Sequence, residues 1–449
     1  MRLPLALQSL LVAAVFWPGP GIIAAETLSL DAAINQALSQ NPVIAGAEAR
    51  AESAKARLSQ AKGSLWPQLN LNYLHTNSDN PLDVFAARLM TRSVDPATDF
   101  SAQNLNEPEE VTLQTTRLNL NWPIYTGGQR LAGIAGARAM SEAGDLGFRF
   151  TRDLVRYQVT STYRALQAAD AGLDIATDAV KAGEQHVATT RRLTREGRII
   201  KSDQLTAEVF LARMKGALAQ ARQQRETAQL QLSTILGNQA GQSYTPVSWV
   251  APVISAVTDA DALVARALAQ RPDLAAVKAQ EQAALARLRG ARGKLHPVVG
   301  LTANRDHYDS DFGEADSWNA GAYVQLNLFN GGSDYYGIRA EHQAVAEAGK
   351  QLEQKRLQVA QEVRTAISRK QIAADRLLIA NDTIGRAQSA VTEVQRRYGQ
   401  GRTILIDLLQ AEAALVQTRT EALSAGLEYE LADAALALAV GNSAATKGE

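Results

Sequence analysis

The chain has 449 residues, enough for two or three ordinary domains, and its formal net charge at pH 7 is zero. A neutral balance argues against a nucleic-acid binder, which needs a basic face. The absence of cysteine excludes disulfides, thiolate metal sites and a lipidated N-terminal cysteine. Only 20% of the residues are charged and 5% are aromatic, which is typical of long packed helices.

The first 25 residues predict a signal peptide. Arg2 supplies a positive end, residues 3–17 form an apolar core, and Ile23-Ala24-Ala25 provides a small-residue cleavage site. The core is too short for a comfortable membrane span, and a retained anchor is the alternative interpretation. No later window has the run of about 18 apolar residues that a membrane helix needs. We therefore expect an exported protein without a helical anchor.

The rest of the sequence is internally duplicated. LSQAKGSLWPQLNLN (58–72) matches LRGARGKLHPVVGLT (288–302), an offset of 230 residues. From Gly127 onward the offset is 204, which predicts a 26-residue insertion between the strands of the first repeat. The predicted divisions are the signal peptide 1–25, a first repeat 26–240, an equatorial linker 241–272, a second repeat 273–442 and a polar tail 443–449.

Each repeat is expected to hold a helix, a pair of strands and two long helices. Residues 128–196 and 332–400 run for 69 residues without proline, so each helix would be about 100 Å long. In the second of these, apolar residues recur every seven positions, as in a coiled-coil seam. They are Ile338, Val345, Leu352, Val359, Ala366, Ala373, Ala380, Ala387 and Val394. A fibrous rod is the alternative that this spacing leaves open.

Short alternating segments before each double glycine argue against a rod. QLNLNY (68–73), RLNLNW (117–122) and AYVQLNLF (322–329) place apolar residues on one face and Asn or Gln on the other. A half-buried soluble sheet would also alternate, but aromatic residues end these apolar faces, as in the interfacial girdle of a membrane barrel. These residues are Trp66, Trp122, Tyr125 and Phe329. The predicted membrane strands are 67–77, 112–124, 297–308 and 317–329.

Four strands leave open edges, which are prohibitively costly in lipid. Several copies must therefore contribute to one barrel. Three copies give twelve strands, an even number that encloses an aqueous lumen. The polar segments 76–110 and 309–316 then belong at the outer surface.

The order and spacing of these motifs resemble the TolC family of outer-membrane efflux and secretion ducts. The resemblance covers residues 26–442 and rests on LSLDAAINQALSQNP, LWPQL, WPIYTGG, LNLFNGG and the paired segments Gly197–Glu208 and Gly401–Glu412. It implies a mainly α, internally duplicated homotrimer, with a twelve-stranded β-barrel in the lipid of the Gram-negative outer membrane and a helical barrel crossing the periplasm.

The resemblance also implies a function. The chain would be the passive exit duct of a tripartite efflux pump or a type I secretion system, carrying small molecules, metal ions or proteins. Its partners would be a periplasmic adaptor and an inner-membrane RND or ABC transporter, with no nucleic acid. A soluble periplasmic coiled-coil adaptor is the rival class, but it would have one helical hairpin and no duplicated strand pairs.

Glycine interruptions mark the expected tips, where each long helix reverses. Glycine permits the positive φ that a tight reversal needs. The predicted tip residues are Gly197, Arg198, Gly399 and Gly401. Asp203 and Asp407 follow, near the start of each returning helix, where capping the helix is the alternative role.

By resemblance, Asp407 of three chains forms a carboxylate ring at the periplasmic entrance. A tyrosine and an arginine of the family hold this entrance closed by binding an aspartate, and here Tyr398 and Asp203 match. The arginine position is Thr403, while Arg402 lies one residue earlier. Gln410 stands where a second acidic ring is expected, so we predict one ring of carboxylates.

No enzyme, metal site or cofactor is expected. The sequence has no nucleophile motif and no phosphate-binding lysine after its glycine pairs. Its five histidines lack the spacing of metal ligands. They are His75, His186, His296, His307 and His342.

Overall fold

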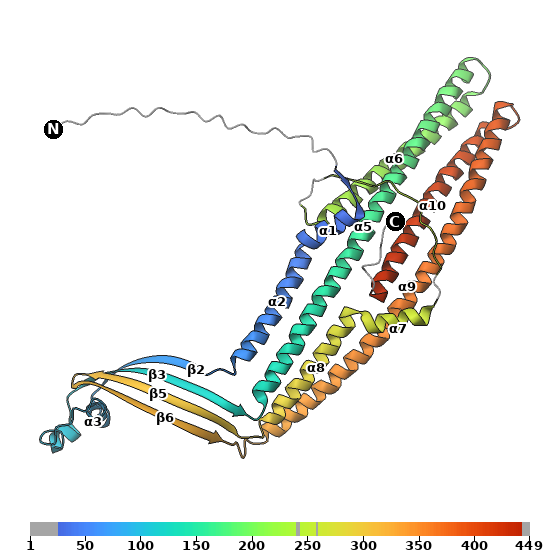
Figure 1. Ribbon diagram of the computed structural model, residues 1–449. Coiled ribbons are helices and arrows are strands. Elements are labelled where there is room, and N and C mark those ends of the chain that lie inside the picture. Colours follow the sequence, from blue (N-terminus) through green and yellow to red (C-terminus); the bar gives the residue numbers. More distant parts are fainter. Residues whose placement is uncertain (1–25, 239–242, 257–258, 442–449) are drawn as a thin grey trace, which may run out of the picture. The chain divides into compact units, whose positions relative to one another are not determined.

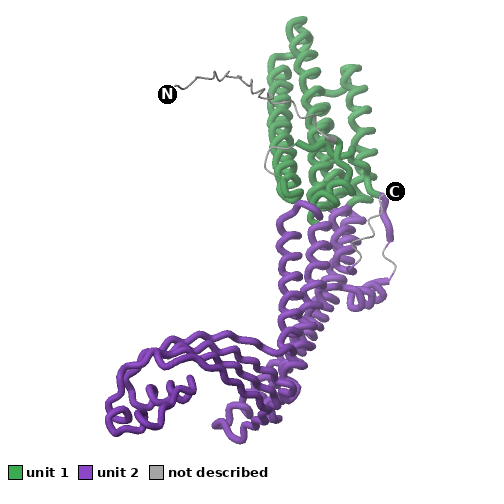
Figure 2. Tube along the Cα trace, turned by 60° about the vertical axis from the view of Figure 1, so that its left-hand side comes forward, with its two compact units in different colours: residues 1–37, 158–252, 377–427 green, residues 38–157, 253–376, 428–449 purple. Residues whose placement is uncertain are grey.

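The computed structural model describes residues 26–238, 243–256 and 259–441. The predicted signal peptide and polar tail lie outside these residues. The chain divides into two compact units. In Figure 2 the first unit (residues 1–37, 158–252 and 377–427) is green and the second (38–157, 253–376 and 428–449) is purple.

Ten helices and six strands make up the described residues (Figure 1). The helices are α1 Leu30–Gln40, α2 Pro42–Gly63, α3 Pro81–Met90, α4 Ala102–Asn106, α5 Gln129–Arg195, α6 Lys201–Ile235, α7 Ala260–Gln270, α8 Pro272–Gly293, α9 Ser333–Gly399 and α10 Leu405–Val440. The strands are β1 Glu26–Leu28, β2 Gln68–Ser78, β3 Val111–Thr126, β4 Tyr244–Pro246, β5 Val298–Ser310 and β6 Gly313–Gln325. Helices α5 and α9 have 67 residues each, about 100 Å.

Equivalent elements of the two repeats begin and end at equivalent residues. Helices α1 and α7, and α2 and α8, are offset by 230 residues at both ends, while α5 and α9 are offset by 204. The glycines with positive φ also recur at 204, as Gly197 and Gly401 show. The prediction of internal duplication is confirmed, and the excess residues of the first repeat form α3 and α4 between β2 and β3.

The second unit contains a four-stranded sheet in the order β2-β3-β5-β6, with every neighbouring pair antiparallel. The four predicted strands are present, but β6 lies four residues earlier than 317–329. It begins at Gly313, directly after a tight turn, and ends at Gln325. The residues beyond it lead into α9 instead. There the Asn330 side chain donates a 2.7 Å hydrogen bond to Asp334 in the first turn of that helix.

Small residues let the helices approach closely, and each unit has its own core. In the first unit, Val187, Ala207, Phe210, Leu405 and Leu409 bring α5, α6 and α10 together. In the second, residues of α7, α8, α9 and the end of α10 form a cluster around Val359 and Val363, both fully buried. Of the helices in the described ranges, none is both long and apolar enough to cross a membrane.

Candidate functional site

One face of the sheet carries a continuous row of asparagines, one from each strand. Asn70 pairs with Asn119, Asn119 with Asn304, and Asn304 with Asn319. The side chains are hydrogen-bonded between Asn119 and Asn304, and between Asn304 and Asn319 at 3.2 Å. An unbroken amide row at the sheet centre is costly to place against lipid and suits contact with water. We call this surface the asparagine face.

A charged pair lies on the asparagine face one row further along. Arg117 of β3 donates to Asp306 of β5 at 2.6 Å, and Tyr308 donates to the same carboxylate at 3.1 Å. Asp306 is almost completely buried. Its charge is compensated by two donors, which a buried carboxylate requires.

The opposite face of the sheet is apolar and exposed over its helix-proximal part, while Arg305, His307 and Asp316 share this face nearer the β5–β6 turn. Leu69, Leu71 and Trp318 are 63%, 70% and 79% exposed, and the pairing register places Leu118, Leu120 and Leu301 on the same side. A soluble monomer rarely leaves so many large side chains together in water. Such a face indicates contact with lipid or with another chain.

The predicted interface aromatics lie near the helix-proximal ends of the strands. Trp122 is in β3 and donates from Nε1 to the carbonyl of Leu65 at 3.0 Å. Tyr125 follows it in the same strand. Trp66 precedes β2, and Phe329 lies four residues beyond the end of β6; both are highly exposed.

Two helical hairpins in the first unit end in glycine turns. Gly197 (φ 70°) lies between α5 and α6, and Gly401 (φ 69°) between α9 and α10. Each turn closes with a hydrogen bond to the helix that it leaves, from Arg198 N to Leu193 O and from Arg402 N to Arg397 O, both 2.9 Å. Gly399 is the last residue of α9.

Asp407 lies in the first turn of α10, where its carboxylate accepts a hydrogen bond from the Thr403 hydroxyl. Asp407 and Gln410 both point away from the protein interior, whereas Leu405, Leu408 and Leu409 are buried. The Thr403 contact was not predicted. Its only sequence signal is a hydroxyl residue four positions before an acid at a helix start, which is typical of local capping.

Tyr398 lies within the electrostatic influence of Asp203 of the same chain, although the two residues belong to different hairpins. Tyr398 packs against the cluster around Phe210. Burial, and then the negative charge of Asp203, raise the pKa of the Tyr398 hydroxyl. No hydrogen bond joins these two side chains in the described part of the chain, and Arg402 is exposed in the turn beside them.

A second contact between the hairpins was not predicted from the sequence. His186 Nε2 of α5 lies 3.0 Å from Glu412 Oε1 of α10, with both side chains mostly buried. His186 Nε2 has no aligned hydrogen bond within the described residues, so the contact is a close polar approach. Phe210 of α6 packs edge-on against the histidine ring. The three residues are far apart in sequence, and nothing in their spacing brings them together.

The sheet has one amide face and one exposed apolar face, and the long helices reverse at glycine turns. Together these features indicate an outer-membrane channel protein. The chain belongs to the outer membrane efflux protein family, whose model matches residues 33–238 and 263–442. The outer membrane efflux protein BepC of Brucella suis is 24% identical over 448 residues, covering 98% of this chain and 91% of BepC.

Solved structures show the same fold. The chain aligns with CusC at a TM-score of 0.78 and 18% identity, covering 93% of each chain. It aligns with the Campylobacter jejuni outer membrane channel CmeC at 0.77 and 17% identity, covering 92% and 86%. The predictions of the family, of an outer-membrane location and of an efflux duct are confirmed, and the adaptor alternative is disfavoured. The named relatives are efflux proteins.

Proposed function

We propose that three copies of this chain form the passive exit duct of a tripartite efflux pump. The observation that carries the proposal is the isolated sheet, whose edge strands β2 and β6 have no partner within the described residues. Because every pairing in the sheet is antiparallel, β6 of one copy continues onto β2 of the next in the same pattern. Twelve strands then close, and no edge remains unpaired in lipid.

In this assembly the two faces of the sheet have different environments. The exposed leucines and Trp318 contact lipid, and the asparagine face lines the lumen. Amide rows offer donors and acceptors to water without selecting one charge, so the duct does not discriminate strongly among solutes. Selection of cargo then belongs to the inner-membrane RND or ABC transporter that feeds the duct through a periplasmic adaptor. The relative named cation efflux system protein CusC points to metal ions as one such cargo.

The glycine turns at 197 and 401 form the periplasmic entrance in this proposal. Asp407 is exposed beside the turn, so three copies around an axis bring three carboxylates together. Tyr398, Asp203 and Arg402 lie where the two hairpins of one chain meet, and they hold the entrance closed. A passive duct requires no catalytic step of any residue.

Recording in planar bilayers tests the function. The detergent-extracted protein is expected to give discrete ion-conducting steps, and a Tyr398→Phe variant should keep them. Release of the protein by osmotic shock, together with silent bilayers for both proteins, would contradict a membrane duct and favour a soluble periplasmic role.

A further inference from the structure

The segment between β2 and β3 (residues 79–110) holds the excess residues of the first repeat, and we call it the insertion segment. It folds into α3 and α4 at the strand ends remote from the long helices (Figure 1). Helix α3 buries Val84 and Ala87 against Val111 of β3, with Leu113 and Phe312 packed around them. The segment is therefore attached to the sheet by its own small core.

The pairing register identifies the face that the insertion segment covers. Val111 and Leu113 lie an even number of residues from Asn119, and β3 has no bulge before Pro123. Their side chains thus share the face of Asn119, since alternate residues of a strand point to the same side. The insertion segment lies on the asparagine face and leaves the leucine face uncovered.

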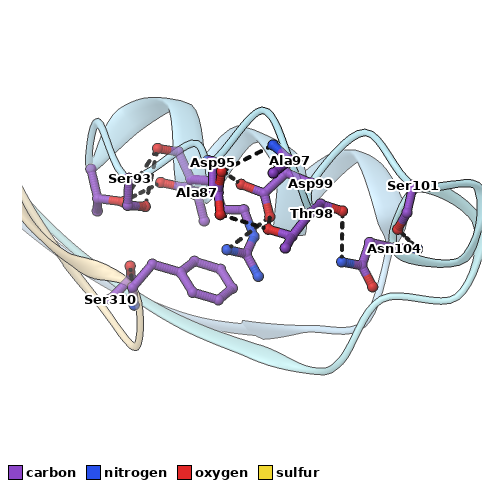
Figure 3. A network of polar contacts seen from close by, with 12 residues as sticks. Ala87, Ser93, Asp95, Ala97, Thr98, Asp99, Ser101, Asn104 and Ser310 are labelled. Atoms are coloured by element: carbon purple, nitrogen blue, oxygen red, sulfur yellow. Dashed lines mark hydrogen bonds and ion pairs between the residues drawn. The ribbon is translucent and has the colours of Figure 1, made fainter.

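Polar contacts make the insertion segment an ordered body. Arg88 stacks on the Phe312 ring at 3.7 Å and pairs with Asp99 at 3.1 Å. Figure 3 shows Asp99 among the backbone and side chains of the 95–104 loop, where it accepts from Asp95 N at 2.7 Å. Arg92 reaches the far edge of the sheet and donates to the carbonyl of Asp316 at 2.9 Å. These contacts join the segment to the β5–β6 turn and to β6, one edge strand of the sheet.

Large apolar side chains of the insertion segment stay exposed in the single chain, even though Phe100 packs edge-on against Phe85. Leu82, Leu89 and Phe100 are 74%, 55% and 57% exposed. If the asparagine face lines a lumen, these side chains point into the mouth of that lumen, where two more copies of the same segment lie. Apolar groups that meet around an axis leave water and stabilise the contact.

We propose that the insertion segment is an outer lid, in which three copies meet through Leu82, Leu89 and Phe100 and limit the size of solute that passes the outer end. This inference rests on the proposed trimeric duct. It places a size limit at the β2–β3 end of the sheet, independent of the Asp407 ring.

Cysteine labelling on intact cells tests the lid, because the chain has no cysteine of its own. Asn70→Cys places the thiol on the asparagine face, and its neighbour Leu71→Cys places it on the lipid face as a matched control. Glu314→Cys, beside the exposed β5–β6 turn, reports access to the cell surface. Each cysteine variant is made in two backgrounds, one with the full insertion segment and one with residues 81–107 replaced by a short Gly-Ser linker. Each protein is then treated with a small maleimide or with a bulky polyethylene-glycol maleimide, both of which are membrane-impermeant.

We expect the small reagent to label Asn70→Cys in both backgrounds, and the bulky reagent to label it only after shortening. Leu82→Asp combined with Leu89→Asp should also admit the bulky reagent, since six carboxylates around one axis repel. Val250→Asp with Val253→Asp, at residues that are 73% and 90% exposed in the linker, is the control and should not admit the bulky reagent.

Two other outcomes would overturn the inference separately. Equal labelling by the bulky reagent with and without the insertion segment means that there is no lid, while the duct stands. Failure of the small reagent to reach Asn70→Cys in the shortened protein, while Glu314→Cys reacts, means that the asparagine face is not an outward-opening lumen. That result overturns the proposed duct and the lid with it.

Discussion

Asn41 and Arg271 occupy equivalent positions in the two repeats, yet they stabilise the following helix in different ways. The Asn41 side chain accepts a 2.8 Å hydrogen bond from Val43 N and caps α2. Arg271 makes no side-chain cap for α8; its guanidinium is buried and donates to Asp273 at 2.7 and 2.9 Å and to Glu362 of α9 at 2.6 Å. A local cap in one repeat is thus replaced by a tertiary ionic network in the other.

The two residues should therefore differ in their contribution to stability. Asn41→Ala is expected to cost about 1 kcal/mol, the usual value of a lost cap. Arg271→Ala should cost more, about 2–3 kcal/mol, because it removes a buried guanidinium that pairs with Asp273 and Glu362, while Lys355 still compensates Asp273. Unfolding in detergent, followed by circular dichroism, measures both, with Asn41→Asp as the variant that keeps a cap. Equal losses would show that the network adds nothing beyond a cap.

The same network predicts a particular acid sensitivity. Burial alone would raise the pKa of Asp273, but hydrogen bonds from Arg271 and Lys355 outweigh it and lower the pKa to about 2. A lowered folded-state pKa contributes stability above the unfolded value of about 4, and this contribution is lost as the pH falls through about 2. Allowing for solvent screening, it is worth about 1–2 kcal/mol. Asp273→Asn should be less stable at neutral pH but should lose less stability between pH 4 and pH 2; parallel curves would refute the assignment.

The turn glycines offer a comparison within one hairpin. Gly401 has a φ of 69° and no atom within 4 Å of an added Cβ, so Gly401→Ala introduces backbone strain without a clash. We expect a loss of about 1 kcal/mol in unfolding free energy. Gly399, two residues earlier, ends a helix without positive φ, and Gly399→Ala should be neutral or slightly stabilising. If the two substitutions have the same effect, the left-handed turn is not what requires glycine at 401.

Charge at the proposed entrance predicts block by cations. Three Asp407 carboxylates around an axis attract divalent and trivalent cations, which should block conductance when added from the periplasmic side. Asp407→Ala should relieve the block, whereas Asp178→Ala, an exposed aspartate on α5, should not. Single-channel recording reads both. Unchanged block in Asp407→Ala would leave the aspartate with only the local role that its contact with Thr403 indicates.

Closure at the same entrance is a separate prediction. Asp203→Ala and Tyr398→Phe should raise the resting conductance, because each removes a polar group where the two hairpins of a chain meet. His186→Gln tests the neighbouring contact with Glu412, which is 3.0 Å across the same pair of hairpins. If none of the three changes the resting current, the hairpins are held by their apolar cluster alone.

Helix and strand positions followed from local signals in the sequence. Proline at 42 and 272 begins α2 and α8, and glycine at 197 and 401 ends the long hairpins, so equivalent residues predicted equivalent boundaries. The alternation in β2 and β3 likewise predicted their two faces. The predicted end of β6 at residue 329 was wrong. Residues 326–329 keep the alternating pattern, but the strand ends at Gln325 and the hydrogen bond between Asn330 and Asp334 stabilises the start of α9.

Contacts between residues that are distant in the sequence could not be predicted from it. The complete asparagine row depends on pairing register across four strands, and Asn319 lies in a segment with no regular alternation of its own. The packing of α3 on the asparagine face and the approach of His186 to Glu412 likewise depend on tertiary geometry. The 26-residue change of offset predicted an insertion there, but not how it folds or which face it covers.

Closure of one barrel by three copies is measured by the native mass of the detergent-extracted protein. We expect a particle of three chains, because β2 and β6 are the unpaired edges of the sheet in the described residues and twelve strands leave none open. A stable monomer that fully retains its sheet in detergent would rule out the trimeric duct.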